Sequence, residues 1–397
     1  MTESRRNNLE KLCGVMAHGM VVIFGLTCLW LYYHQSIADL SLPDPIPYQS
    51  DLPLHISMVV EDGWYYSFTA FFYKALYVLC GGSTVGIAVL LATVSVVSVY
   101  ATQRLIVILQ GTEPDISVGQ GWRNTILALT LNLVMPCYLR FVGEYRYVSY
   151  QSPNIWHNST YICMRMMALL VLIQYFKLEK KYREGITLRE WVCFALLNVI
   201  CTGVKPSFLL VFSPIVGLYL LADLFRKVPL VRILAFGSAL LPSGLVILWQ
   251  NRVLFGEDTG NGISFHPWYT FSLHARLTKP AVLCSVLFCV AALLVTCKQL
   301  RTDKKYQFLV LMAGLGFGEA LCLVESGTRS VDGNFLWGYS FCLFMLFTVC
   351  AVKWLDIRWG SLRTVIKLGL GMLYCWHLYC GIYFFIELVG GASYWLT

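Results

Sequence analysis

Long runs of apolar residues, separated by short polar stretches, follow one another along this sequence. A helix that crosses a membrane needs about 20 consecutive, mostly apolar residues. By this measure the pattern predicts about eleven membrane-spanning helices. The expected spans are 12–33, 84–109, 122–139, 159–177, 190–204, 206–225, 233–251, 280–297, 307–325, 335–354 and 366–389. We therefore expect an all-α, polytopic membrane protein that forms a single integral membrane domain over residues 1–397.

The composition supports a membrane protein and gives no sign of a disulfide framework or a cysteine metal site. Of all residues, 57% are hydrophobic and only 13% are charged, whereas soluble domains usually carry about a quarter charged residues. Most of the 15 cysteines fall within the expected spans, where a thiol behaves as a small apolar group. Their spacing matches no metal-binding pattern. The cysteines therefore predict neither a disulfide framework nor a cysteine metal site.

The basic residues between the spans predict the orientation of the chain. Lys and Arg near the ends of spans are retained in the cytoplasm. Basic residues gather at the N-terminus and at 177–189, 226–232, 298–305 and 353–367, all on one side of the expected bundle. We therefore expect a cytoplasmic N-terminus. This topology accounts for the formal net charge of +8, so nucleic acid is not implied as a partner.

Two long segments are expected on the outer side, at 34–82 and 252–279. The first contains two short helices that should lie along the membrane surface. Ser50 can cap the first helix and Gly63 can end it. The second, over 68–77, is rich in the aromatic residues that favour the membrane interface. The 252–279 segment shows no recognisable motif, and we interpret it only as a lid or a sugar platform.

The first of these helices presents an acid beside an imidazole. Asp51 and His55 are one turn apart and share a polar face, while Asp62 lies about 16 Å farther along the helix. Asp62 therefore cannot form a close pair with Asp51. We interpret Asp51 and His55 as candidate catalytic residues, with Asp51 as a general base, and Asp62 as a candidate substrate-binding residue. A solvated face on an amphipathic helix would produce the same pattern.

The segment 152–160, Ser-Pro-Asn-Ile-Trp-His-Asn-Ser-Thr, is unusually polar for the entrance to a span. If the helix starts near Asn158, its free N–H groups favour an anion, and Arg165 lies on nearly the same face. Asn154, His157, Asn158 and Arg165 are therefore candidate substrate-binding residues, with a phosphate as the expected ligand. A helix start that is simply capped would explain the same residues.

Further charges lie close to the ends of spans on the outer side. Lys205 occupies a tight turn, and Glu325, Arg329 and Asp332 follow the 307–325 span. Charges at this depth are costly, and they usually face a cavity or a partner. All of these residues are candidate substrate-binding residues. An internal Glu325–Arg329 ion pair is the alternative explanation for two of them.

Together these residues place acids, imidazoles, amides, cations and aromatic rings on one membrane face, an inventory that suits carbohydrate chemistry. With Ser50-Asp51-Leu52-Pro53-Leu54-His55 in a long first outer loop, the chain resembles the GT-C superfamily of integral membrane glycosyltransferases. The resemblance implies a polyprenyl-phosphate-linked sugar donor, a glycan or other acceptor, and membrane lipids as partners. It also implies that Asp51 is the essential acid, in a bacterial plasma-membrane protein of polysaccharide biosynthesis whose site faces outward.

The sequence also departs from the family pattern. Asp51 has no adjacent second acid, and the nearest acidic pair is Glu61-Asp62. The cofactor therefore stays unknown: a divalent metal is compatible with the family, but no ligand motif supports one.

Other functions stay open on the sequence alone. One is a polymerase of polysaccharide repeat units, and another is a transporter or flippase of lipid-linked sugars that uses the intramembrane charges, including Glu319. A scaffold or receptor would leave its polar residues without a shared pocket. Convergence of Asp51, His157, Arg165 and Lys205 on one cavity would separate a ligand-binding protein from a scaffold.

Overall fold

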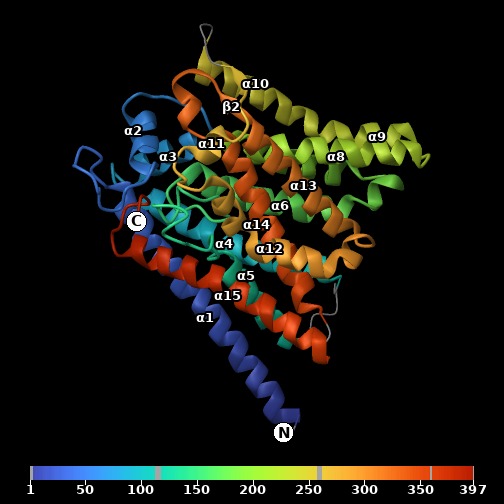
Figure 1. Ribbon diagram of the computed structural model, residues 1–397. Coiled ribbons are helices and arrows are strands. Elements are labelled where there is room, and N and C mark those ends of the chain that lie inside the picture. Colours follow the sequence, from blue (N-terminus) through green and yellow to red (C-terminus); the bar gives the residue numbers. More distant parts are fainter. Residues whose placement is uncertain (1–2, 112–117, 257–261, 358–359, 397) are drawn as a thin grey trace.

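The computed structural model describes residues 3–111, 118–256, 262–357 and 360–396, and Figure 1 shows that they form mainly helices packed side by side. The helices are α1 (Glu3–Ser36), α2 (Leu52–Val60), α3 (Phe68–Leu79), α4 (Val85–Gln110), α5 (Val118–Leu131), α6 (Ser159–Leu178), α7 (Leu188–Val204), α8 (Ser207–Phe225), α9 (Leu230–Gly237), α10 (Leu241–Phe255), α11 (Tyr269–Ser272), α12 (Thr278–Leu300), α13 (Lys304–Cys322), α14 (Asn334–Leu355) and α15 (Ser361–Val389). Three short 3-10 helices, η1 (Lys181–Arg183), η2 (Ser238–Leu240) and η3 (Gly327–Val331), join them.

Eight helical stretches among the described residues are long and apolar enough to cross a membrane. They lie in α1, α4, α6, α8, α12, α14, α15 and the stretch from α9 through α10, and they identify an integral membrane protein. The expected number of eleven spans is not confirmed. The other three, at 122–139, 190–204 and 307–325, correspond to α5, α7 and α13. Of these, α5 and α7 have only 14 and 17 residues, and α13 includes Glu319.

The expected span at 122–139 is wrong in its second half. α5 ends at Leu131, and the chain has no regular helix or strand from residue 132 to residue 158. Two local features end the helix. The Asn132 side chain donates to the Ala128 carbonyl at 2.8 Å, and Pro136 disfavours a helical conformation in the residue before it.

Neighbouring helices satisfy the backbone that follows this break. The Met135 N–H donates to the His377 carbonyl of α15, and the Cys137 N–H donates to the Cys284 carbonyl of α12, both at 3.1 Å. Met135 and Cys137 are almost completely buried. Buried backbone groups need such partners, so the irregular segment is held firmly between α12 and α15.

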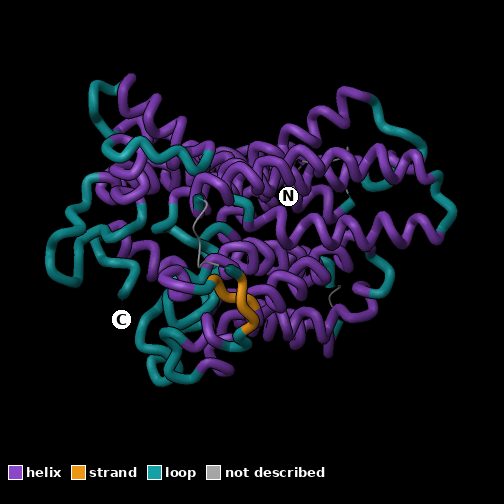
Figure 2. The backbone as a smooth tube through the Cα atoms, turned by 90° about the horizontal axis from the view of Figure 1, so that it is seen from above, coloured by secondary structure: helices purple, strands orange, loops and turns teal. Residues whose placement is uncertain are grey.

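One two-stranded sheet departs from the all-α expectation. β1 (Ile263–Phe265), in the segment 252–279, pairs antiparallel with β2 (Leu323–Glu325), which directly follows α13. In Figure 2 the two strands lie among the loops of one face. The sheet joins the long loop to the end of α13. Residues 257–261 of that loop lie outside the described residues.

The two ends of the bundle differ in chemistry. One end, which we call the pocket end, carries Asp51, Lys205 and the chain's last described residues. The other end is held by ion pairs. Lys353 and Asp303 approach to 2.7 Å, and Asp223 pairs with Arg183 at 2.6 Å and with Arg226 at 2.9 Å. The basic stretches at 177–189, 226–232, 298–305 and 353–367 contribute to these contacts or lie beside them.

A glycine in α15 makes room for the irregular segment, and this contact can be tested. A Cβ at Gly381 would overlap the Leu133 carbonyl oxygen, and overpacking of this kind costs about 1–3 kcal/mol. We predict that Gly381→Ala lowers the melting temperature of the purified protein by at least about 2 °C. The control is Gly369→Ala in the same helix, where no atom lies within 4 Å. Equal melting temperatures for the two variants would contradict this packing.

Candidate functional site

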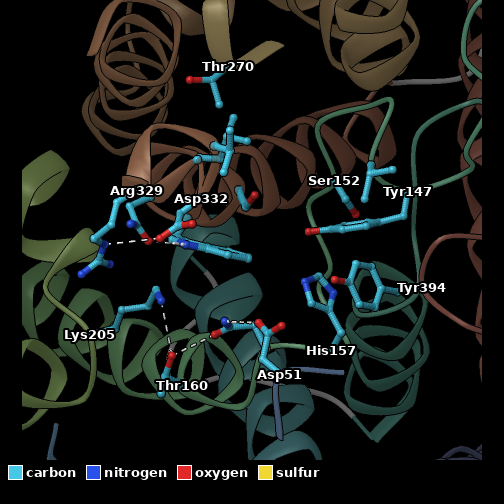
Figure 3. A pocket seen from close by; sticks show the side chains of 18 of the residues that line it. Asp51, Tyr147, Ser152, His157, Thr160, Lys205, Thr270, Arg329, Asp332 and Tyr394 are labelled. Carbon is cyan, nitrogen blue, oxygen red and sulfur yellow. Dashed lines mark hydrogen bonds and ion pairs between the residues drawn. The ribbon is translucent and has the colours of Figure 1, made fainter. Parts of the chain in front are cut away.

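A cavity of about 590 Å³ lies at the pocket end. Its walls come from α2, the loop between α5 and α6, the turn between α7 and α8, α11, the region from η3 into α14, and the segment after α15. Figure 3 shows side chains from these separate parts of the chain converging on one space. A second cavity of about 390 Å³ adjoins it and shares Lys205 and Arg329 with it.

The structure brings most of the candidate residues to this site. The first cavity is lined by Asp51, His55, His157, Asn158, Lys205, Arg329 and Asp332. Glu325 lines the second cavity. Asp62, Asn154 and Arg165 line neither cavity. Asp62 is exposed beyond the end of α2, and the other two are buried beneath the site.

The loop before α6 is polar and yet almost fully buried. Its polar residues Ser149, Gln151, Ser152, Asn154, His157, Asn158, Ser159 and Thr160 are each at most 6% exposed. Buried polar groups are stable only when they are hydrogen-bonded. The Asn154 side chain accordingly donates to the carbonyls of Leu131 at 3.0 Å and Val134 at 2.8 Å.

Arg165 supports this loop from below. Its guanidinium donates to the side-chain oxygen of Asn154 and lies over the rings of Phe344, at 5.3 Å, and Trp156, at 6.0 Å. Arg165 is 1% exposed, so its side chain points into the helix bundle. The structure therefore gives Arg165 a contact that orders the loop rather than a place in the cavity.

The same loop fixes Asp51. The Asp51 N–H donates to the His157 carbonyl at 3.0 Å, and the Asn158 amide donates to the Asp51 carboxylate at 2.7 Å. The other end of the Asn158 side chain accepts the Tyr161 N–H at 2.9 Å, which caps α6. One asparagine thus satisfies both the helix start and the carboxylate.

A chain of hydrogen bonds extends from this carboxylate to a lysine, as the dashed lines in Figure 3 show. The Lys205 ammonium donates to the Thr160 hydroxyl at 3.3 Å, and this hydroxyl donates to the Asn158 side-chain oxygen at 2.8 Å. The Asn158 amide then donates to Asp51. An acid and a cation are therefore held in a defined arrangement in one cavity.

Of the two cations that line the pocket, Lys205 and Arg329, Lys205 is the one without an acidic partner among the described residues. Its ammonium lies 4.8 Å from the centre of the Trp337 ring, and it forms no ion pair within the part of the chain that the structure describes. Burial lowers the pKa of Lys205 to about 8, although the negative charge of Asp51 opposes that shift. A nearby anion would stabilise the charged form.

Arg329 is held by acids of its own segment. Its guanidinium lies 3.0 Å from Glu325 and 3.3 Å from Asp332, which confirms the internal Glu325–Arg329 ion pair considered from the sequence. Glu325 also accepts the Asn334 amide at 2.7 Å. The two acids orient the guanidinium at the boundary between the two cavities.

The two imidazoles next to Asp51 are uncharged at neutral pH. Burial lowers the pKa of His55 to about 4 against the effect of the Asp51 carboxylate, and burial also lowers the pKa of His157. The His55 ring contacts the Ser159 hydroxyl at 3.0 Å. The positive charge of the pocket therefore comes from Lys205 and Arg329.

No metal ligand set is evident in this pocket. Among the residues that the structure describes, no group of three or more His, Cys, Asp and Glu side chains is arranged to hold a metal ion. The acids at Asp51 and Asp332 have hydrogen-bond and ion-pair partners of their own.

Several pocket residues were missed by the sequence analysis. They are mainly aromatic residues and small polar residues, namely Tyr66, Tyr147, Gln151, Ser152, Thr160, Thr270, Trp337, Tyr394 and Trp395. Aromatic residues near the ends of spans are also common lipid anchors, so their type alone did not mark them. The density of polar residues at 152–160 was the available signal, because Thr160 belongs to that segment.

The chain matches no known protein-family model, and no curated protein sequence matches it. The pocket combines the Asp51 carboxylate, the Lys205 ammonium and the Arg329 guanidinium with surrounding aromatic rings.

The lowered pKa of His55 predicts a specific acid sensitivity. An unfolded histidine takes up a proton as the pH falls below about 6.5, whereas folded His55 resists protonation until about pH 4. Protons thus favour the unfolded state below pH 6.5, and we expect His55 to cost the fold about 2 kcal/mol by pH 4.5. The measurement is the melting temperature of purified protein between pH 7.5 and 4.5.

Two variants isolate the contribution of His55. His55→Gln should lose stability less steeply over this range, while His266→Gln, which changes an exposed residue, should follow the wild type. The same slope in His55→Gln and the wild type would show that His55 is not held in its neutral form.

Proposed function

We propose that this chain is a GT-C-like membrane glycosyltransferase that transfers a sugar from a polyprenyl-phosphate-linked donor to an acceptor hydroxyl. The observation that carries the proposal is the hydrogen-bonded chain from Lys205 through Thr160 and Asn158 to Asp51. A carboxylate can take the proton of an attacking hydroxyl. An ammonium can hold the phosphate that leaves.

In the proposed reaction the acceptor oxygen attacks the anomeric carbon of the donor sugar. Its proton passes to the Asp51 carboxylate as the new carbon–oxygen bond forms. The bond between the anomeric carbon and the phosphate oxygen breaks, and its electron pair stays on the phosphate. Lys205 and the neighbouring Arg329 stabilise that charge, because charge-assisted hydrogen bonds to phosphate are strong.

The second cavity supports a lipid-linked donor. Lys205 and Arg329 line it together with Leu210 of α8 and with Ile247 and Leu254 of α10, beside the polar residues Gln250, Asn251 and Glu325. Leu210 is 40% exposed. A donor with a phosphate and a long apolar tail suits two cations that lie beside apolar side chains of two helices.

Convergence on one cavity supports a ligand-binding protein over a scaffold. Three of the four residues whose convergence was to separate these functions, Asp51, His157 and Lys205, line the first cavity, and Arg165 does not. Of the charges that a transport path would use, Lys205 lines both cavities, while Arg165 and Glu319 line neither. A polymerase that joins lipid-linked repeat units would use the same carboxylate and cations, with a lipid-linked glycan as its acceptor.

The distribution of charge supports the proposed location. The pocket lies at the end of the bundle away from the ion pairs of Asp223, Asp303 and Lys353, near which the basic stretches gather. Basic stretches are retained on the cytoplasmic side. We propose on this basis that the pocket faces outward, and the resemblance to the GT-C superfamily adds a bacterial plasma membrane as the proposed location.

Removing the charge of Asp51 tests the proposed general base. We predict that Asp51→Asn lowers sugar transfer by at least about 100-fold, because an amide cannot take the proton of the acceptor. The amide oxygen can still accept from Asn158, so the melting temperature should change little. Transfer is measured with purified protein, labelled undecaprenyl-phosphate-linked sugars and membrane glycans as acceptors.

The matched control for this experiment is Asp62→Asn, which removes an exposed acid near the other end of the same helix and should leave transfer unchanged. Full transfer by Asp51→Asn would remove Asp51 as the base. Equal losses in both variants would point to a general effect of charge near the pocket.

The pKa of Lys205 predicts how phosphate binding depends on pH. Because the ammonium loses its proton near pH 8, we expect undecaprenyl phosphate to bind more weakly as the pH rises from 7 to 9.5. Lys205→Arg keeps its charge over that range, so its binding should stay nearly constant. The measurement is a calorimetric titration in detergent, and parallel pH profiles for the wild type and Lys205→Arg would contradict the role of Lys205.

A further inference from the structure

Away from Lys205, the wall of the first cavity is built of rings. We call His157, Tyr147, Tyr394, His274 and Trp395 the aromatic arm. The His157 and Tyr394 rings stack with their centres 4.2 Å apart and their planes 13° apart, and Tyr147 meets His157 edge-on at 4.9 Å. Trp395 and His274 pack edge-to-face at 5.0 Å. Figure 3 shows Tyr147, His157 and Tyr394 close together beside the cavity, and the Tyr394 and Trp395 rings, 5.5 Å apart, connect the two groups of rings.

His157 in this arm has unused hydrogen-bonding capacity. Its side chain is among the buried polar groups, at 6% exposed. Its ring nitrogens contact no hydrogen-bond partner among the described residues, although its backbone carbonyl accepts from Asp51. These nitrogens are not among the fully buried polar atoms without a partner, so the ring is accessible from the cavity that it lines. A bound hydroxyl can pair with them there.

Tyr147 offers a second such group beside it. Its hydroxyl points toward the cavity in Figure 3, and it has no hydrogen-bond partner within the described part of the chain. A phenol can both donate and accept a hydrogen bond. His157 and Tyr147 therefore present neighbouring polar atoms to the same space.

The aromatic arm carries no charge at neutral pH. Burial lowers the pKa of both His157 and His274, and burial raises the pKa of Tyr147 and Tyr394, the latter to about 12. Four other side chains of the cavity wall, Gln151, Ser152, Thr270 and Ser340, are neutral as well. The charges that act on the arm are Asp51 and Lys205 at His157, and Asp51 and Asp44 at Tyr394. The fixed charges of the cavity lie at Asp51, Lys205, Arg329 and Asp332.

We propose that the aromatic arm binds an uncharged sugar of the acceptor, with one of its hydroxyls directed at Asp51; this inference rests on the proposed function. A pyranose has apolar C–H faces that pack on rings and hydroxyls that pair with neutral donors and acceptors. A carboxylated or phosphorylated sugar would lose part of its hydration here and would lie close to the Asp51 carboxylate, which repels it. The hydrogen bond from the Asp51 N–H to the His157 carbonyl places the aromatic arm next to the proposed base.

The segment after α15 is therefore part of the binding site, and it is firmly attached. The Tyr48 N–H donates to the Gly391 carbonyl at 3.1 Å, and the Arg146 N–H donates to the Leu396 carbonyl at 2.8 Å. The Ser393 hydroxyl also donates to the Gln49 side chain. These contacts hold Tyr394 and Trp395 against the cavity.

Binding of free glycans tests this proposal without requiring sugar transfer. The full-length protein in lipid nanodiscs is applied to an array of neutral oligosaccharides and their uronic-acid-containing counterparts, and binding to the best neutral glycan is then titrated. We expect the wild type to bind neutral glycans in preference to acidic ones. Tyr394→Ala should weaken that binding about fivefold or more, because a stacking ring is lost.

Three further variants separate binding from folding. Tyr394→Phe keeps the ring and should bind within about twofold of the wild type, whereas His157→Phe keeps the stack but removes the polar atoms and should bind at least about fivefold more weakly. Tyr379→Ala changes a tyrosine of α15 that is 66% exposed and should bind as the wild type does.

Preference for acidic glycans, glycan binding that Tyr394→Ala and His157→Phe leave intact, or no glycan binding at all would overturn the proposal. The glycan titration contains no lipid-linked sugar donor, so its result can be interpreted even if the protein transfers no sugar. If the protein binds neutral glycans through the aromatic arm but has no transferase activity, the sugar-binding site is supported and only the proposed reaction is refuted.

Discussion

The polar loop between α5 and α6 is buried, so its polar groups need hydrogen-bond partners within the protein, because water does not provide them at this depth. Several contacts at the pocket end meet that need. Asn154 binds the carbonyls released where α5 ends, and Gly381 leaves room for the same stretch of backbone. Asn158 caps α6 and binds the carboxylate of Asp51. The loop thus positions an acid while it satisfies its own polar groups.

The cavity that results is divided by charge. On one side, Lys205 and Arg329 lie where the second cavity adjoins the first. On the other side, neutral rings surround His157, and Asp51 lies between the two sides. A group-transfer enzyme needs this kind of division, because the leaving phosphate requires positive charge while a neutral sugar does not.

Helical periodicity accounts for the parts of this site that the sequence could predict. Asp51 and His55 share a face because they are one turn apart, and Leu52, Ile56 and Val59 are buried on the opposite face. Asn158 caps α6 as its residue type indicates. Arg165 was expected below Asn158 as part of a phosphate site, but its guanidinium is buried and donates to the Asn154 side chain. Only the tertiary structure shows that Asn154 lies within its reach. Tyr394 likewise reaches His157 through the path of the chain after α15, which no local pattern encodes.

A structure of the purified protein with undecaprenyl phosphate bound tests the central claim most directly. The account predicts the phosphate within hydrogen-bonding distance of the Lys205 ammonium, with Arg329 beside it and the isoprenoid tail along Leu210 between α8 and α10. The cavity beside Asp51 should stay open for the acceptor. A phosphate at the opposite end of the bundle, or a tail that fills the aromatic arm, would contradict the account.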